Sequence, residues 1–254
     1  MVQQLTPVIS DTEHDIIYPE SDGKPMADNT IQFRWIVTVK ENLEILFAAI
    51  ADVFIAGDLF WYPVEKSSKC QAPDAMVVFG RPKGDRRSYK QWEENNIAPQ
   101  VVFEILSSSN TTKEMANKLL FYQRYGVEEY YIYDPVQVDL TGLQRSGEDL
   151  EVIEEINGWV SPRLGVRFEL TPDQLEIYRP DGQRFLTFME LDQLREQERQ
   201  RAEQERQRAE QERQRAEQER QHKEEALLQL EQERQRYQEL LARLQSRGIN
   251  PENL

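Results

Sequence analysis

Apolar residues recur at two different spacings along the first 190 residues, and each spacing predicts a different kind of element. Between Asp28 and Ile50 they come at helical spacing, directly after side chains that are suited to capping a helix. A second helix is expected from Thr111 to Tyr125, where Gly126 ends the pattern. Short runs of β-branched and aromatic residues predict strands at 53–62, 75–79, 100–106 and 129–133. This order predicts an α/β domain of the mixed α+β kind, with helices packed on a mixed sheet.

Polar and turn-forming residues divide the rest of the chain. Residues 1–27 are polar and contain several prolines, so we expect an extended N-terminal arm before a domain at 28–190. The charged stretch 80–99 is expected to form a long loop, which is often functional in a compact domain. Beyond residue 133 we expect a β-rich extension that runs to about residue 185. Its turns are predicted at Ser146-Gly147, Asn157-Gly158 and Asp181-Gly182, the last two being typical of hairpins.

Residues 191–254 are predicted to form a long charged helix with a short C-terminal tail. The seven residues Arg-Ala-Glu-Gln-Glu-Arg-Gln occur three times in succession, starting at 201, 208 and 215, with no glycine or proline. One column of this heptad repeat passes through Ala202 and Leu230, and the other passes through Arg206 and Leu227. The apolar second half, from Leu227 to Leu244, favours a coiled-coil dimer. A single solvated helix held by intrahelical ion pairs is the alternative.

Composition limits the kinds of partner that the chain can bind. The net charge is −15, and the chain from Arg195 onward holds 13 basic and 14 acidic residues, so almost all of the excess lies in the domain. An acidic domain repels a phosphate backbone at long range, and any nucleic-acid role therefore requires a local basic surface or bound cations. One cysteine and two histidines supply neither a disulfide nor the usual zinc and serine-protease chemistry. Without a signal-peptide pattern or a long apolar run, a cytoplasmic location with no membrane contact is expected.

Two acidic residues lie at the edges of apolar runs. Asp74 precedes Ala75 and its strand, and Glu104 lies inside the strand at 100–106. A charge in such a run costs free energy unless it is paired or holds a metal. Carboxylates at matching heights on adjacent antiparallel strands can share a hard cation, with the Ile105 backbone carbonyl as a third oxygen ligand. Magnesium is the expected cation.

A lysine near such a site would stabilise developing negative charge on a phosphate. Lys118 is the candidate, because a short connection returns its helix to the end of the Glu104 strand. Glu114 lies four residues earlier on the same helix face and is expected to orient Lys118 by an ion pair. Lys113 lies about 140° around the helix from Lys118 and is expected to point elsewhere.

The chain resembles the PD-(D/E)XK nuclease superfamily and, more closely, the restriction endonuclease family labelled domain of unknown function 820. The resemblance covers about residues 20 to 190, and four segments carry it: Ala72-Pro73-Asp74-Ala75-Met76-Val77-Val78-Phe79, Pro99-Gln100-Val101-Val102-Phe103-Glu104-Ile105-Leu106-Ser107, Lys118 with Tyr122, and Gly126-Val127-Glu128-Glu129-Tyr130-Tyr131-Ile132-Tyr133-Asp134-Pro135.

This resemblance implies a restriction-endonuclease-like core and Mg²⁺-dependent cleavage of DNA. It makes Asp74 and Glu104 metal ligands and Lys118 the catalytic lysine, which has moved to the helix because Leu106 occupies the superfamily's usual lysine position. It also implies a supporting acid on the first helix, either Glu41 or Glu44.

The charged stretch 80–99 contains the best basic cluster of the domain, with Tyr89 and Trp92 between its cations. As a DNA-contact surface it would place cations on phosphates and aromatic rings on bases. These cations are Arg81, Lys83, Arg86, Arg87 and Lys90. A solvated loop is the alternative.

The sequence therefore favours a metal-dependent DNA endonuclease that the C-terminal helix assembles into a dimer. The rival hypothesis is a catalytically inactive protein that keeps the nuclease fold for binding or assembly and oligomerises through the same helix. The acidic charge and Leu106 favour the rival, whereas Asp74, Glu104 and Lys118 together favour the enzyme.

Overall fold

The computed structural model describes residues 18–21, 23 and 25–246, and it divides the chain into two units, Met1–Phe188 and Met189–Leu254. Most of the predicted N-terminal arm, residues 1–27, lies outside the described residues. The ring of Tyr18 packs edge-on against Tyr62, with 5.2 Å between the ring centroids. The Tyr62 hydroxyl donates a hydrogen bond of 2.6 Å to the carbonyl of Pro19. These contacts attach the described part of the arm to the domain.

The first predicted helix is confirmed as α1 (Thr30–Leu46), but it ends earlier than expected. The Asn29 side chain caps it by accepting a hydrogen bond of 2.9 Å from the backbone N–H of Gln32. The helix buries a stripe of apolar side chains against the sheet. The chain turns after Leu46, so Ile50 lies outside the helix and is 44% exposed.

The predicted mixed sheet is confirmed and has six strands. Their order is β1-β3-β5-β6-β7-β8, and β5 and β6 are the parallel pair in an otherwise antiparallel ladder. The strands are β1 (Val53–Ala56), β3 (Ala75–Phe79), β5 (Val101–Ile105), β6 (Glu129–Asp134), β7 (Asp139–Ser146) and β8 (Asp149–Val152). A parallel pair needs a crossover connection, and α2 (Thr112–Arg124) supplies it. Gly126, with φ of +92°, follows this helix as predicted.

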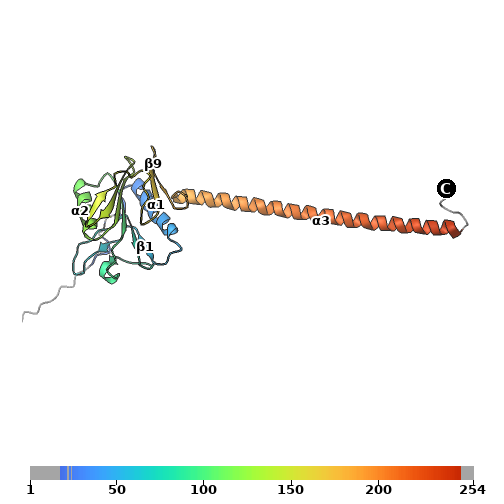
Figure 1. Ribbon diagram of the computed structural model, residues 1–254, viewed down its shortest axis with the longest axis horizontal. Coiled ribbons are helices and arrows are strands. Elements are labelled where there is room, and N and C mark those ends of the chain that lie inside the picture. The colour runs from blue at the N-terminus through green and yellow to red at the C-terminus, as the bar shows by residue number, and fades with distance from the viewer. Residues whose placement is uncertain (1–17, 22, 24, 247–254) are drawn as a thin grey trace, which may run out of the picture. The chain divides into compact units, whose positions relative to one another are not determined.

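The two helices lie on opposite faces of the sheet (Figure 1). Because side chains alternate along a strand, Val77 and Phe103 pack into the core on the α1 side. Met76 and Val102 pack into a second core with Tyr122 of α2. The central strands are therefore covered on both faces, and any polar group on them is removed from water.

The stretch 80–99 carries more structure than the predicted loop. A strand within it, β4 (Tyr89–Lys90), pairs in parallel with β2 (Trp61–Tyr62), and the short helix η1 (Gln91–Glu93) follows. Tyr89 is fully buried, and its hydroxyl donates to the carbonyl of Ile97 at 2.7 Å. The prediction that this ring stacks on bases is therefore wrong.

The β-rich extension is present, with one of its predicted turns in a different role. Strands β9 (Arg167–Leu170) and β10 (Leu175–Tyr178) form an antiparallel pair of their own. The Asn157-Gly158 pair forms the predicted turn, since the Trp159 N–H donates to the Ile156 carbonyl at 3.1 Å, but it lies along β9 and joins no two paired strands. The Asn157 side chain accepts from the Leu170 N–H, and the Gly158 N–H donates to the Phe168 carbonyl. The other two predicted turns follow β7 and β10.

The second unit contains a long helix, α3 (Phe188–Ser246), that begins three residues before the predicted boundary. Its 59 residues extend about 88 Å at 1.5 Å per residue. Intrahelical pairs occur at heptad-related positions, among them Glu196 with Arg199 and Glu217 with Arg220. No helix among the described residues is long and apolar enough to cross a membrane.

A buried glutamate, Glu129, ties the segment before β9 to the sheet. One of its carboxylate oxygens accepts from the hydroxyls of Tyr131 and Ser161, and the other accepts from the backbone N–H of Arg163 at 2.8 Å. Donors from the fold therefore bind both oxygens of Glu129. Its role is structural.

We predict that Glu129→Leu destabilises the domain, because it leaves the buried Ser161 hydroxyl and the half-buried Arg163 N–H without their acceptor. The expected loss is about 2–3 kcal/mol in the free energy of unfolding, measured by denaturant titration. Glu128→Gln is the matched control, since the exposed ion pair between Glu128 and Arg163 contributes less than about 1 kcal/mol. Equal losses in the two variants would contradict this role.

Candidate functional site

The β3–β5 ladder brings Asp74 and Glu104 opposite each other. Ala75 pairs with Phe103 in this antiparallel ladder, so the next pair outward is Asp74 with Glu104. Side chains that face each other across a ladder lie on the same side of the sheet. Both side chains are buried on the face that α2 covers. The predicted pairing of the two carboxylates is therefore present in the fold.

Both carboxylate oxygens of Glu104 are bound by side chains of α2. The Lys118 Nζ donates to Oε2 at 2.7 Å, and the Tyr122 hydroxyl donates to Oε1 at 2.5 Å. Burial raises the pKa of Glu104, while Lys118 and Tyr122 act to lower it. The paired ammonium is the compensation that a charge in a central strand requires.

Asp74 immediately precedes β3, and fewer hydrogen-bond donors stabilise its charge than stabilise that of Glu104. Its Oδ2 accepts a hydrogen bond of 2.6 Å from the backbone N–H of Ile105. Burial and the nearby Glu104 carboxylate together raise the pKa of Asp74 well above its usual range. Asp58 raises it further, with a smaller effect. A buried carboxyl group whose ionisation is disfavoured by a second carboxylate is typical of functional sites.

The connection between β5 and α2 places Lys118 over the end of its strand. The Asn110 side chain accepts from the Ser107 N–H at 2.8 Å, and the Thr111 hydroxyl caps α2 by accepting from the Glu114 N–H. Lys118 then lies on the helix face turned to the sheet, as predicted. Burial lowers the pKa of Lys118, but the Glu104 carboxylate outweighs burial and leaves it raised.

The oxygen atoms at the end of β5 fit a hard divalent cation. Asp74 and Glu104 supply carboxylates, and the Ile105 carbonyl supplies a third oxygen, which also accepts from Gln32 Nε2 at 2.8 Å. A cation there would offset the repulsion that raises the pKa of Asp74. Within the described part of the chain, no three histidine, cysteine or acidic side chains form a metal-binding group. The carbonyl would therefore complete the set of protein oxygens.

The predicted supporting acids on α1 are paired within their own helix. Glu41 and Glu44 on α1 both pair with Lys40, at 3.0 and 3.8 Å. Glu114 raises the pKa of Lys118 only as a minor influence, and no ion pair joins the two among the described residues.

Two residues at the site were not predicted in their present roles. Gln32, rather than an acid, is the α1 side chain that reaches the end of β5. Its position in phase with Ile36, Val39 and Leu43 was a usable signal, because a polar residue on a buried stripe needs a partner. Tyr122 was expected to serve in packing, although it follows Lys118 by one helical turn.

The cations of 80–99 all have partners inside the chain. Arg81 and Arg86 converge on Glu94, at 2.6 and 2.7 Å, and Lys83 donates to backbone carbonyls at the end of α1. Burial would raise the pKa of Glu94, yet the hydrogen bonds from Arg86 and Arg81 leave it lowered. Arg87 has the freest side chain, 85% exposed and paired with Glu20 at 3.4 Å.

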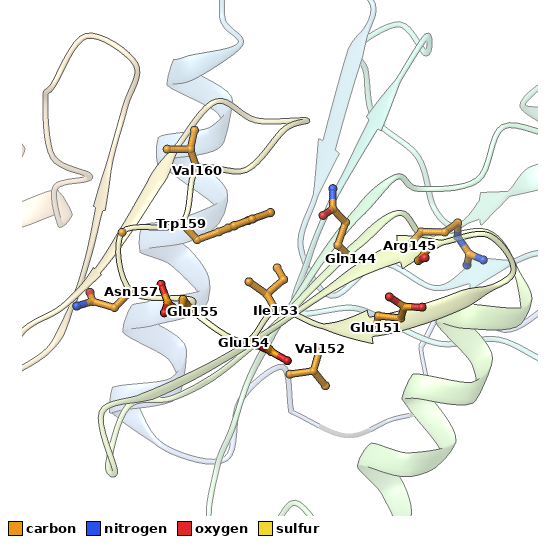
Figure 2. Close-up of a pocket in the computed structure, with 12 residues that line it drawn as sticks. Gln144, Arg145, Glu151, Val152, Ile153, Glu154, Glu155, Asn157, Trp159 and Val160 are labelled. Atoms are coloured by element: carbon orange, nitrogen blue, oxygen red, sulfur yellow. The ribbon is translucent and has the colours of Figure 1, made fainter.

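A hollow of about 940 Å³ lies beside β7, β8 and residues 153–160, and neither Asp74 nor Glu104 lines it. Figure 2 shows Trp159 and Ile153 within it and Gln144 across from them. Its lining includes Glu151, Glu154 and Glu155. Such a surface repels a phosphate backbone. The lining also includes Arg145, but its net charge is negative, and this disfavours contact with a nucleic acid.

Opposite stability effects are predicted for neutral variants of the two acids. The folded-state pKa of Asp74 lies above its unfolded value, so stability is fully present below the unfolded pKa and is lost as pH rises from there to the folded pKa. Asp74→Asn should therefore raise the melting temperature at pH 8, by about 2–4 °C for each kcal/mol of repulsion removed. This gain should vanish as pH falls to the ordinary aspartate pKa of about 3.9.

Glu104→Gln should have the opposite effect at neutral pH. It leaves the Lys118 ammonium buried without its counter-ion, at an expected cost of roughly 3 kcal/mol in unfolding free energy. Thermal and denaturant unfolding of both variants beside the wild type provide the comparison. Stabilisation by Glu104→Gln would contradict the pairing.

No curated protein matches the chain. Among solved structures, a protein described as a "putative nuclease belonging to DUF820" from Anabaena variabilis is similar at 16% identity and a TM-score of 0.41, over 55% of this chain and 74% of that one. The Uma2 family model, described as "Putative restriction endonuclease", matches residues 24–232. This match spans Asp74, Glu104 and Lys118 as well as most of α3, and the chain belongs to the Uma2 family.

Proposed function

We propose that this protein is a Mg²⁺-dependent DNA endonuclease whose active site is built on Asp74, Glu104 and Lys118. The observation that carries the proposal is the juxtaposition of two buried carboxylates with a lysine ammonium 2.7 Å from one of them. Membership of a family described as "Putative restriction endonuclease" supports a nuclease. A divalent metal commonly assists the hydrolysis of phosphodiesters. The all-oxygen donor set favours Mg²⁺ over softer cations.

Each residue has a distinct part in the proposed reaction. Asp74, Glu104 and the Ile105 carbonyl would hold the cation, which when bound supplies Lewis-acid polarisation of a phosphodiester. Lys118 keeps its positive charge, since its pKa is raised, and can stabilise negative charge that develops on the phosphate. The hydrogen bond from the Ile105 N–H holds Asp74 in place for this role.

The rival hypothesis, an inactive nuclease fold used for binding, rested on the acidic charge of the domain and on Leu106 at the usual lysine position. The contact between Lys118 and Glu104 supports the enzyme instead, because an ammonium from α2 reaches the acid from the covered face. A buried lysine–glutamate pair beside a second carboxylate is costly for stability alone. A catalytic role would explain why such a costly arrangement is present.

The substrate would approach an acidic domain, so local cations matter for binding. Arg87 is the best candidate for a phosphate contact, because its exposed side chain can leave Glu20 at little cost. Arg81, Lys83, Arg86 and Lys90 would contribute after release from their internal partners. A cytoplasmic location forms part of the same proposal.

Nicking of supercoiled plasmid DNA tests the proposed reaction. The wild type should nick DNA with Mg²⁺ and not with EDTA, and Asp74→Ala should lower the rate at least about 100-fold. Lys118→Met should show a loss of similar size, since it removes the positive charge of α2 that is proposed to stabilise negative charge on the phosphate. Activity that persists in EDTA or in Asp74→Ala would exclude this mechanism.

Lys113→Met provides the matched control for the lysine. Lys113 belongs to the same helix but is exposed, whereas the Lys118 side chain is only 13% exposed and pairs with Glu104. Its replacement should leave the nicking rate within about twofold of wild type, because surface changes of this kind rarely disturb a distant site. Equal losses in both lysine variants would point to a general effect of charge on DNA binding.

We propose further that α3 assembles the chain into a dimer. Leu227, Leu230 and Tyr237 are exposed along the predicted heptad seam, and a matching helix would bury them. Two joined domains would bring two active sites to one DNA molecule. A pair of sites can cut both strands, whereas one site cuts one.

Leucines on and off the seam allow a matched test of the dimer. Leu230 lies on the seam and Leu228 off it, and their exposures are similar at 63% and 58%. In sedimentation equilibrium, Leu230→Lys should weaken the dimer by at least about tenfold in dissociation constant, as expected for a charge at a core position. Leu228→Lys should sediment as wild type. A monomeric wild type would exclude the assembly.

A further inference from the structure

The Tyr122 hydroxyl contacts one of the proposed metal ligands and has no part in the mechanism above. Tyr122 and Lys118 are separated by one turn of α2, so both side chains reach the same glutamate. Tyr122 donates to Oε1 of Glu104 and Lys118 donates to Oε2. A carboxylate has about four lone-pair positions, so two remain for other partners.

Close packing fixes the ring that carries this hydroxyl. Tyr122 is fully buried and stacks parallel to Trp61, with the ring centroids 6.3 Å apart and the planes inclined by 1°. The ring of Tyr130 meets it edge-on at 4.9 Å. A ring held from two sides presents its hydroxyl at one point. Tyr122 is thus a rigid donor, unlike a flexible lysine.

Tyr130 shows that burial and packing alone do not require such a hydrogen bond. It lies on β6 on the same face, and its hydroxyl is buried with no hydrogen-bond partner among the described atoms. Burial, and then Glu104 and Asp74, raise the pKa of Tyr130, which places its hydroxyl within the field of the same carboxylates. The two tyrosines differ chiefly in whether they bind Glu104.

We propose that Tyr122 is a positioning residue that, together with Lys118, fixes the orientation of the Glu104 carboxylate for metal binding. The inference rests on the proposed function, since it assigns Tyr122 to the metal site. The terminal torsion of glutamate is broad, so a free carboxylate must lose rotational freedom when it binds a cation. Two donors on different oxygens remove that freedom in advance. Partners of this kind typically change metal affinity 10- to 100-fold.

Calorimetric titration of the full-length protein with Mg²⁺ tests the role of Tyr122 without relying on activity. Tyr122→Phe keeps the ring and its packing but removes the donor, so its Mg²⁺ affinity should fall about 10- to 100-fold. Tyr130→Phe is the matched control, because it removes a neighbouring buried hydroxyl that binds no partner, and its affinity should equal that of wild type. Thermal unfolding in EDTA should show that both variants stay folded.

The other possible results of this titration would each contradict either the role of Tyr122 or the proposed function. Wild-type affinity in Tyr122→Phe overturns the positioning role, and so does an equal fall in both variants, which would indicate a packing effect. Loss of folding in metal-free Tyr122→Phe also overturns it, because the hydroxyl would then serve stability. If the wild type itself binds no Mg²⁺, the proposed metal-dependent function fails instead.

Discussion

The domain is organised around the burial of one carboxylate, that of Glu104, in a strand covered on both faces. Strand β5 lies between β3 and β6 near the middle of the sheet, where an uncompensated charge is costly. Its two donors, Lys118 and Tyr122, come from consecutive turns of α2. The helix must therefore follow β5 and cover this face, and the same arrangement assembles the candidate site. The same two side chains of α2 therefore stabilise the charge of Glu104 and line the candidate site.

A comparison with Glu129 shows why burial of an acid does not by itself indicate function. Glu129 lies on the neighbouring strand and is equally buried, yet donors from the fold bind both of its oxygens. Glu104 likewise has a donor on each oxygen, but it also faces a second carboxylate, Asp74, whose pKa it raises. Repulsion between two acids weakens the fold unless something else binds them. The second carboxylate, rather than burial, therefore distinguishes the candidate site.

Local patterns were enough to predict the main elements, because their signals lie within single segments. Helix α1, helix α2 and the strands that carry Asp74 and Glu104 all formed as expected. The errors occurred where distant segments meet. Residues 89–90 became a strand because β2 offered them a partner, and Asn157-Gly158 lies along β9 instead of turning a hairpin. Pairing over such distances leaves no periodicity that a short window could detect.

The sequence by itself determined the elements, the heptad repeat of α3 and the two acids with their lysine, since an acid in an apolar run and a lysine on the next helix are visible as local anomalies. Only the tertiary structure decided which groups bind them. Gln32 reaches the carbonyl of Ile105 across 73 positions, and Tyr122 reaches Glu104 across 18. Hydrogen bonds act over about 3 Å in space, whereas residue spacing is informative only within one element. The partners of the site are therefore a property of the fold.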